Sequence, residues 1–539
     1  MKKLLAVVLT LAMILSLGLG MALADGTQEM TTLKILTREA NKDYFANNRD
    51  SQFIWQEYQK MFHDAGIDFE YEVLPDAEQY KTTIQTRLAS GHDLPDLFYG
   101  GDTTIPDLLD LADMGIVLKI NEIFEITKGD AYNYFYGGPG DAARNLLSDE
   151  NGDFYWLPRI QVNQMDGENA GTSIAVSIRK DWLDTLGMAV PTTLDEFKAA
   201  LKAFQDNDMN GNEVVDEMYV ADTSRFNCGI NLWFGIPTCT NDSIGINLTE
   251  QTVTSAWYSP NIKEYFTYVR SLVEEGLISA DYIGTGASTS ADLAANKIAA
   301  LEYYPIGIYK EATVRAGGCP EAYYIGIYPI EAVPGTKPFY SEETPYLVYL
   351  RHCVSNAASD KLDVVAKYFD IIYSEPSINL MQNGVEGKTY EVNPDGTIHM
   401  LTVGMSVDEK MAAGLMTIDN LARYVMPNMY FNERLNEMQS TIDAGFPEKV
   451  DYEKSTMRYQ PRTPNDNTSY YALSTPEETE ILDKYDTDLE TASRELAANI
   501  CLGAVSIDDI EAGIENLKAL GLDEVLAVRT AQYNRAIGK

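Results

Sequence analysis

The run Asp68-Phe69-Glu70-Tyr71-Glu72-Val73 alternates polar and apolar side chains, which is the pattern of a β-strand with one buried face. Gly66, just before it, ends a segment whose apolar residues are spaced as on one face of a helix. The neighbouring segments predict two further strands, at residues 33–36 and 94–98, and two helices, at residues 52–65 and 79–89. Strands that alternate with helices in this order are typical of an α/β layer.

A second α/β pattern begins at Ile174-Ala175-Val176-Ser177-Ile178, after a polar loop. A helix is expected over residues 194–204, and Thr193 with Glu196 has the signature of a capping box at its start. Another apolar strand, Ile298-Ala299-Ala300-Leu301, leads into Glu302-Tyr303-Tyr304-Pro305. From about residue 362 the chain is predicted to be mostly helical, with a second capping box at Thr475-Pro476-Glu477-Glu478.

The bulk composition bounds the class of protein. The chain has 539 residues, 45% of them hydrophobic and 10% aromatic, so it is not disordered and is too long for a single hydrophobic core. Its formal net charge is −40. Such an acidic surface repels nucleic acid and anionic lipid headgroups, so neither is expected as a partner. It argues more weakly against a polyanionic ligand, because a local basic pocket can override the average charge.

Residues 1–24 have the three parts of a secretory signal peptide. Lys2 and Lys3 precede an apolar run over residues 4–19, and Ala22-Leu23-Ala24 supplies the small residues of a cleavage site. The apolar run is shorter than the roughly 20 residues of a membrane-spanning helix, although an uncleaved anchor is the alternative. We therefore expect cleavage after Ala24 and export to the periplasm or the cell exterior.

The cysteines do not form a disulfide framework, because they are few and odd in number for an exported chain. The five are Cys228, Cys239, Cys319, Cys353 and Cys501. Cys228 and Cys239 either pair across a loop or remain buried thiols.

Four segments, in the right order, resemble signatures of extracellular solute-binding proteins of family 1, the carbohydrate-binding subunits of ABC transporters. They are Ala89-Ser90-Gly91-His92-Asp93-Leu94-Pro95-Asp96, the stretch from Ile178-Arg179-Lys180-Asp181-Trp182 to Phe197, Asn383-Gly384-Val385-Glu386-Gly387-Lys388-Thr389-Tyr390, and residues 521–535. The similarity extends from Leu33 to Arg535. Many members carry a cysteine for a lipid anchor just after the signal peptide, but residues 18–27 contain none, so no lipid anchor is expected.

The resemblance implies a periplasmic-binding-protein-like fold of type II, with two α/β lobes joined by a multi-strand hinge and a ligand held between them. Residues 25–158 and 301–350 would form the N-terminal lobe, and residues 159–300 and 351–539 the C-terminal lobe. The chain would cross between the lobes near residues 154–173, 301–305 and 346–355. The implied function is capture of an oligosaccharide by a monomer and its delivery to the permease subunits of an ABC transporter, without enzymatic activity.

The most specific local pattern is Asp206-Asn207-Asp208-Met209-Asn210-Gly211-Asn212-Glu213-Val214-Val215-Asp216-Glu217. Calcium takes six to eight oxygen ligands from a tightly turning loop, and Gly211 permits such a turn. In an EF-hand register the first ligand is Asp206. In the shorter register, similar to that of alginate-oligosaccharide binding proteins, the ligands are Asp208, Asn210, Asn212, the Val214 carbonyl, Asp216 and Glu217. The shorter register is preferred because residues 218–220 do not have a helical pattern, and an acidic turn without metal is the alternative. Calcium would be structural.

Aromatic residues that can stack on sugars, and acids that can bind hydroxyl groups, are the candidates for ligand contact. Trp156 and Tyr303-Tyr304 lie beside expected crossings, and Trp233 and Trp257 fall in loop-like segments. Asp102 follows a strand's carboxyl end, where α/β sheets bind ligands. Glu386 lies in a family-like motif. Core packing competes with ligand contact for every ring, and a turn or helix role competes for Glu386.

Two other functions stay open at the level of sequence. A secreted glycoside hydrolase needs only two well-placed carboxylates, which 81 acidic residues can supply. No zinc-protease, serine-hydrolase or cysteine/histidine signature is present. A binding protein for peptides or another small solute would share the same two-lobe fold.

Overall fold

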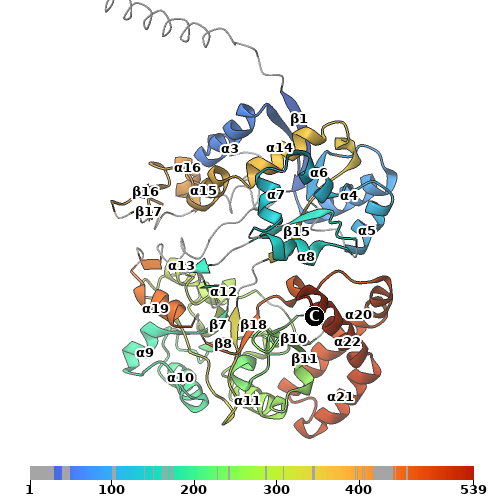
Figure 1. The fold of residues 1–539 in the computed structure, drawn as a ribbon. Coiled ribbons are helices and arrows are strands. Elements are labelled where there is room, and N and C mark those ends of the chain that lie inside the picture. Colours follow the sequence, from blue (N-terminus) through green and yellow to red (C-terminus); the bar gives the residue numbers. More distant parts are fainter. Residues whose placement is uncertain are drawn as a thin grey trace, which may run out of the picture.

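The structure is a computed structural model in which two α/β lobes lie one above the other (Figure 1). It describes residues 30–38, 49–99, 105–138, 140–149, 151–160, 164–165, 168–169, 174–227, 229–240, 243–285, 288–307, 309–342, 346–394, 396, 398–402, 405, 407–416, 441–442, 445–456 and 459–539. The expected signal peptide, Asp102 and Cys228 lie outside these residues.

The first lobe is built on a five-stranded sheet of order β2-β1-β3-β15-β4. Its strands are β1 (Thr31–Arg38), β2 (Ile67–Leu74), β3 (Leu97–Tyr99), β4 (Trp156–Ile160) and β15 (Tyr346–Val354). β1 runs parallel to β2 and β3, whereas β15 is antiparallel to β3 and β4. The expected strands at residues 33–36 and 68–73 are present, and the one expected at residues 94–98 begins only at Leu97.

Nine helices belong to the described part of this lobe. They are α3 (Phe53–Asp64), α4 (Ala77–Ser90), α5 (Ile105–Asp113), α6 (Ile120–Thr127), α7 (Asp130–Phe135), α8 (Asp141–Leu147), α14 (Leu362–Ile372), α15 (Glu375–Asn383) and α16 (Val407–Ala413). Short strand pairs are formed by β5 (Gln164–Met165) with β6 (Glu168–Asn169), in the passage that leaves this lobe, and by β16 (Tyr390–Val392) with β17 (Ile398–Met400).

Asp96, in the first family-like motif, links two segments of this lobe that are far apart in the sequence. Its side chain is buried, and Oδ2 accepts hydrogen bonds from the Lys34 backbone N–H and from Lys361 Nζ, both at 2.8 Å. Lys361 stands at the start of α14 and also donates to the Thr32 carbonyl. The aspartate therefore joins the first strand of the sheet to a helix more than 300 residues later in the chain.

The second lobe is built on the sheet β13-β7-β12-β8. Its strands are β7 (Ala175–Arg179), β8 (Met218–Val220), β12 (Ile298–Tyr303) and β13 (Tyr324–Gly326). Two smaller sheets are formed by β9 (Cys239–Thr240), β10 (Ile244–Asn247) and β11 (Thr252–Ser255), and by β14 (Tyr340–Glu342) with β18 (Arg462–Pro464).

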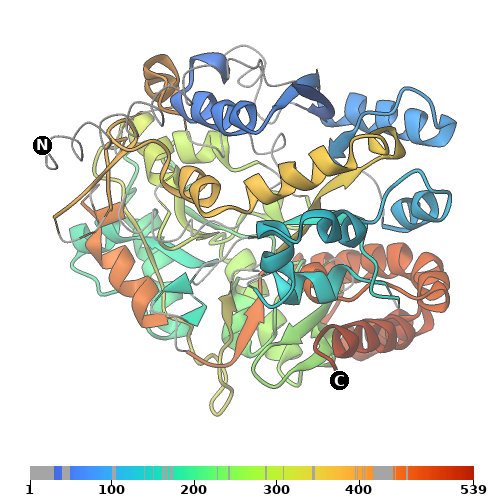
Figure 2. The same ribbon diagram turned by 45° about the horizontal axis from the view of Figure 1, so that its top comes forward.

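The helices of the second lobe cover its sheets and extend to the C-terminus. They are α9 (Lys180–Leu186), α10 (Leu194–Asp206), α11 (Ile262–Glu274), α12 (Ser290–Ala294), α13 (Tyr309–Ala316), α19 (Pro447–Thr456), α20 (Pro476–Cys501), α21 (Ile510–Ala519) and α22 (Leu522–Ala536). Figure 2 shows α20 and α22 side by side at one end of this lobe. The capping box at Thr475 is confirmed. At Thr193 the cap bond from Glu196 N–H forms, but the Glu196 carboxylate accepts from Thr192 instead.

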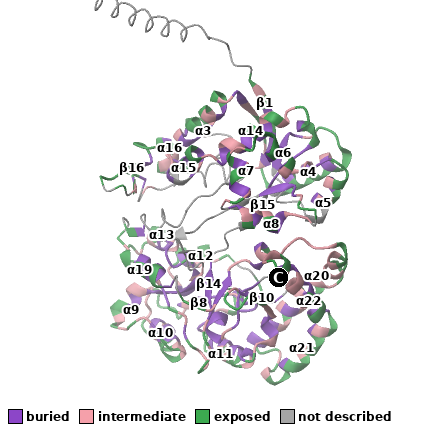
Figure 3. Cartoon of the chain, viewed as in Figure 1, coloured by how far each residue is buried: buried purple, intermediate pink, exposed green. Residues whose placement is uncertain are grey.

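Each lobe has buried residues in its interior (Figure 3). The residues that form the main core of each lobe divide the chain at other positions than the sequence suggested. Residues 353–416 contribute to the core of the first lobe, and β13 with its flanking residues packs on the second sheet. For residues 309–342 and 353–416 this is the reverse of the expected assignment, whereas β15 and the C-terminal helices lie in the expected lobes. The physical reason is that β12 pairs with both β7 and β8 up to Tyr303, so the chain stays in the second lobe there and does not cross near residues 301–305.

In the described part of the chain, residues 31–160 and 346–416 belong to the first lobe and residues 174–342 and 441–539 to the second, so the described chain changes lobe three times. After the last passage, α19 docks on the second lobe through a buried ion pair. Lys449 and Glu311 are each 1% exposed, and Lys449 Nζ donates to Glu311 Oε1 and to the Gly307 carbonyl. Burial lowers the pKa of Lys449, although the Glu311 carboxylate opposes this.

Replacement of one partner of this pair leaves a buried charge without its counterion. We expect Lys449→Ala to lower the free energy of unfolding by about 3–5 kcal/mol, measured by urea denaturation. The double variant Lys449→Met with Glu311→Gln should recover part of the loss. Lys454→Ala, on the exposed face of the same helix, is the matched control and should change stability by less than about 0.5 kcal/mol. An equal midpoint for Lys449→Ala and wild type would show that the pair does not hold α19.

Candidate functional site

The strands β8 and β12 pair in parallel, and this pairing places polar groups at both ends of the second sheet. Met218 lies opposite Ile298, and Val220 opposite Leu301. The loop of residues 207–217 therefore meets Lys297 at the amino ends of the two strands. At their carboxyl ends, Asp222 follows β8 and Glu302 is the last residue but one of β12. Ligands of α/β sheets bind at the carboxyl ends of strands.

The loop of residues 207–217 is curled around its own side-chain oxygens. Backbone φ is positive at Asp208, Gly211 and Glu213, so the turn needs a conformation that glycine adopts most easily. The Asp208 carboxylate accepts from the N–H groups of Asn212 at 3.0 Å and Glu213 at 2.9 Å. Asn210 Oδ1 accepts from Asn212 N–H, also at 3.0 Å. Asp208, and not Asp206 at the end of α10, thus supplies the carboxylate around which the turn closes.

Asp216 and Glu217 complete the loop from its far end. Asp216 accepts from Asn210 Nδ2 at 2.7 Å, from Asn212 Nδ2 at 3.0 Å and from Lys297 Nζ at 3.1 Å. Burial raises the pKa of Asp216, but these three donors outweigh burial and hold the pKa below its ordinary value. Glu217 is fully buried, and its Oε1 accepts from Asn210 N–H at 3.1 Å. Glu217 Oε2 is buried with no hydrogen-bond partner among the described residues.

The chemistry of this loop fits a hard cation. Within the described residues no group of three or more His, Cys, Asp and Glu is arranged to hold a metal ion. The loop instead mixes carboxylates with amides, and the amides of Asn210 and Asn212 present nitrogen to Asp216. Rotation of these amides would present oxygen, which together with the partnerless Glu217 oxygen makes a donor set of the kind that calcium takes. Strand β8 follows directly, so no EF-hand helix leaves Glu217.

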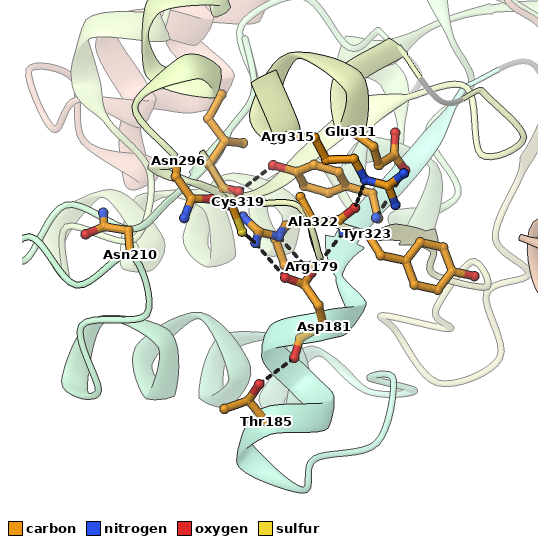
Figure 4. Close-up of polar contacts among 12 residues, drawn as sticks. Arg179, Asp181, Thr185, Asn210, Asn296, Glu311, Arg315, Cys319, Ala322 and Tyr323 are labelled. Carbon is orange, nitrogen blue, oxygen red and sulfur yellow. Dashed lines mark hydrogen bonds and ion pairs between the residues drawn. The ribbon is translucent and has the colours of Figure 1, made fainter. Parts of the chain in front are cut away.

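Arg179, from the second family-like motif, binds Asn296, the residue before the Lys297 that pairs with the loop. It is fully buried, and its guanidinium donates to both oxygens of Asp181 at 2.8 and 2.6 Å and also to Asn296 Oδ1. The guanidinium lies 4.1 Å from the ring centroid of Trp182. Figure 4 shows Arg179 between Asp181 and Asn296, with Asn210 of the loop on the far side of Asn296 in this view. Arg179 therefore fixes the turn that presents Lys297 to Asp216.

Glu302 lies at the other end of the strand pair and has an unusual environment. Its Oε1 accepts a hydrogen bond of 3.1 Å from the Tyr219 hydroxyl. The backbone of Gly229 lies against it so closely that a Cβ there would stand 1.7 Å from Oε1. Burial raises the pKa of Glu302 to about 8; the Tyr219 hydrogen bond opposes the rise and the Asp222 charge adds to it. The sequence analysis did not select Glu302, although an acid at the end of an otherwise apolar strand was the available signal.

Asp222, which follows β8, is held by its neighbours. Its Oδ1 accepts from Ser224 Oγ at 2.5 Å and from the Gly284 N–H at 2.9 Å, and Oδ2 pairs with Arg225 Nε at 2.9 Å. Arg225 is thus already engaged with an acid.

The aromatic candidates fall into two groups. Trp156 is buried in the core of the first lobe, and Trp233 and Trp257 are buried in the core of the second. Trp233 packs edge-on against Phe197, and Trp257 Nε1 donates to Ser493 Oγ at 2.7 Å. In this conformation the three indole rings are closed in by protein, so their contact with a ligand stays a prediction.

Tyr303 and Tyr304 stand beside Glu302 at the end of β12. Tyr303 is buried, whereas Tyr304 is 37% exposed. Glu386 is exposed in a turn of the first lobe, next to β16. Of the predicted ligand residues, the structure thus gathers the two tyrosines at one strand end and leaves Glu386 in the other lobe.

Similarity to solved structures covers nearly the whole chain. The structure of Streptococcus pneumoniae ABC-transporter substrate-binding protein FusA with kestose has a TM-score of 0.70 at 18% identity, covering 94% of this chain and 100% of that one. A human-milk-oligosaccharide (HMO) binding solute-binding protein of Bifidobacterium longum infantis has a TM-score of 0.68 at 19% identity, covering 95% and 99%. The chain has the fold of ABC-transporter solute-binding proteins. The expected fold class, with two α/β lobes, is confirmed.

Sequence similarity points to the same class of protein, as the motifs indicated. The chain is 26% identical over 263 residues to the fructooligosaccharide ABC transporter substrate-binding protein FusA of Streptococcus pneumoniae, covering 47% of this chain and 46% of the relative. It is 24% identical over 227 residues to the polygalacturonan/rhamnogalacturonan-binding protein YtcQ of Bacillus subtilis, covering 41% and 44%. The matched part is thus less than half the length of these curated relatives, and no family model matches the chain.

A third solved structure, alginate-binding protein AlgQ2 without calcium ion, has a TM-score of 0.66 at 18% identity, covering 94% of this chain and 99% of that one. None of the described helices combines the length and the apolar character needed to cross a membrane.

The raised pKa of Glu302 predicts a stability cost that depends on pH. Between its ordinary value of 4.5 and about 8, the folded chain keeps a proton that the unfolded chain releases. The free energy of unfolding therefore falls as pH rises through this window. Glu302→Gln has no such penalty and should be more stable than wild type at pH 8, by about 1 kcal/mol or more, with the difference lost near pH 4. Urea denaturation at both pH values measures this, and an equal difference at both would contradict it.

Proposed function

We propose that this protein captures an oligosaccharide between its two lobes and delivers it to the permease subunits of an ABC importer. The observation that carries the proposal is the match of its fold, over 94% of the chain, to a solute-binding protein solved with the trisaccharide kestose. The two curated relatives and the two solved structures first described above are each named for a carbohydrate ligand or for the transport of one. These proteins are named as binding proteins, and we infer binding without catalysis for this chain.

The ligand would meet the second lobe at the carboxyl ends of β8 and β12. Asp222, Glu302 and Tyr304 follow these strand ends, where hydroxyl partners and an aromatic face lie together. Closure of two lobes about their connecting segments is a known way to enclose a ligand, and the closed form would be recognised by the permease. We infer that the protein acts as a monomer, that residues 1–24 direct its export, and that nucleic acid is not a partner.

A screen of thermal stability tests the proposal, because a ligand that binds only the folded chain raises its Tm. The oligosaccharides are kestose, nystose, lacto-N-tetraose, mannotriose and trigalacturonate, and a tripeptide mixture is the control. At a concentration of 100 times Kd, a bound sugar should stabilise the protein by about 2.7 kcal/mol. A rise in Tm with peptides and with no sugar would favour a peptide-binding protein. Release of shorter sugars from the same oligosaccharides would favour a glycoside hydrolase.

We also propose that the loop of residues 207–217 binds one calcium ion in a structural role. Asp208, Asn210, Asn212, the Val214 carbonyl, Asp216 and Glu217 would hold it. The fully buried Glu217, with one oxygen lacking a partner, supports this, since a cation would compensate that charge. Relatives support it as well: one FusA structure is of an EF-hand mutant, and the AlgQ2 structure is described as lacking its calcium ion. The bound ion would stabilise the entry into β8.

Removal of calcium should therefore lower the Tm of the wild-type protein, and added calcium should restore it. Glu217→Gln should lose this dependence, because it removes the buried charge. Glu213→Gln changes an exposed acid of the same loop that is outside the proposed ligand set, and it should keep the dependence. Differential scanning calorimetry with EDTA and with calcium measures all three. An unchanged wild-type Tm in EDTA would contradict the calcium site.

A further inference from the structure

Glu302 is a partly buried acid, and among the described residues no cation is close enough to shift its pKa. The groups that shift its pKa are the Tyr219 hydroxyl and the Asp222 carboxylate, apart from burial itself. The nearby Tyr265 hydroxyl, on α11, donates to the Thr223 carbonyl. A carboxyl group held in this way stays protonated near neutral pH, and it can both donate and accept a hydrogen bond.

The loop after β8 fixes the position of this carboxyl group. Asn231 is buried, accepts from Gly229 N–H at 2.9 Å, and donates to the carbonyls of Phe226 and Ile236 at 3.2 and 3.1 Å. The loop therefore places Gly229 firmly over Glu302. Any larger residue at position 229 would displace Glu302 Oε1, so the chain keeps room for the acid at this spot.

The charges around this strand end do not suit an acidic sugar. Arg225 is engaged with Asp222, and the Lys310 ammonium lies 5.7 Å from the ring centroid of Tyr303. A carboxylate on the ligand near Glu302 would also lie near the Asp222 carboxylate, which repels it. A sugar hydroxyl, in contrast, finds in Glu302 a group that can donate to it and accept from it.

Building on the proposed function, we propose that Glu302 contacts the ligand and that this strand end sets the ligand's class: the Glu302 carboxyl group exchanges a hydrogen bond with a hydroxyl of an uncharged sugar unit, and the Asp222 carboxylate beside it disfavours uronate units. This role also explains why an acid that lowers stability stands at this position. Acids with a strongly shifted pKa are typical of functional sites.

Isothermal titration calorimetry of the calcium-loaded protein at pH 7 tests the proposal, with the four neutral oligosaccharides of the screen and with trigalacturonate. Wild type should bind at least one neutral oligosaccharide more tightly than trigalacturonate. Glu302→Ala should weaken binding of that sugar about tenfold or more, because the hydrogen bond is lost. Glu302→Gln, which keeps an uncharged hydrogen-bonding group, should stay within about threefold of wild type. Glu264→Ala, an exposed acid on α11, is the control and should bind as wild type.

A second readout separates ligand contact from a purely structural role. A ligand that covers Glu302 disfavours its charged form further, so wild-type affinity should fall as pH rises from 7 to 9.5, through the pKa of about 8. Burial raises the pKa of Tyr219 well above its ordinary value, so Tyr219 stays neutral across this range. The affinity of Glu302→Gln should therefore stay level.

The outcomes distinguish this inference from the function on which it rests. If wild type binds none of the five oligosaccharides, both fail. If it binds trigalacturonate more tightly than every neutral sugar, oligosaccharide capture stands and the assigned class is wrong. If it binds a neutral sugar and Glu302→Ala binds that sugar equally well, capture stands and the role of Glu302 is wrong.

Discussion

The parallel pairing of β8 with β12 is the constraint on which both candidate sites depend. These two short strands pair from Met218 with Ile298 to Val220 with Leu301, with a shift in register between Ile298 and Ala300, and bring the calcium-type loop and Lys297 together at one end. The same register brings Asp222 and Glu302 to the other end. Tyr219 belongs to β8, and its side chain reaches across to Glu302 on β12, so the two strands also share a hydrogen bond. Order in the loop of residues 207–217, which leads into β8, therefore also helps to position Asp222 and Glu302 at the other end of the strand pair.

The division of the chain between the two lobes follows from the position of β12 inside the second sheet. Because β12 pairs on both sides, residues 309–342 remain in the second lobe, and the first lobe is completed only by β15 and the helices after it. Each lobe is thus made of separate segments that close on one another through buried contacts such as Asp96 with Lys361 and Lys449 with Glu311. Lobes built in this way can move as units about the three passages between them, which is what ligand enclosure requires.

Much of this could be predicted from the sequence, and the physical limits of the rest are specific. Alternation and helical spacing located the strands around Leu33, Phe69 and Ile298, since burial leaves a periodic trace in the chain. The acidic loop was recognisable because its oxygen-bearing residues alternate. The lobe boundaries were not predictable, because an apolar strand such as residues 298–301 shows that it is buried but not which neighbours it pairs with. Trp233 and Trp257 show the same limit, since a ring that fills a core and a ring that binds a sugar look alike in sequence. Glu302 was missed because its significance comes from Gly229 and Tyr219, distant residues that only the fold brings beside it.

The central claim is that an uncharged oligosaccharide binds between the lobes at the carboxyl ends of β8 and β12. A crystal structure of the calcium-loaded protein with the tightest-binding neutral oligosaccharide tests it most directly. We expect the sugar to contact both lobes, with one of its hydroxyl groups within about 3.2 Å of a Glu302 carboxyl oxygen. A sugar bound on the outer surface of either lobe, or one enclosed between the lobes without contact to Glu302, would contradict it.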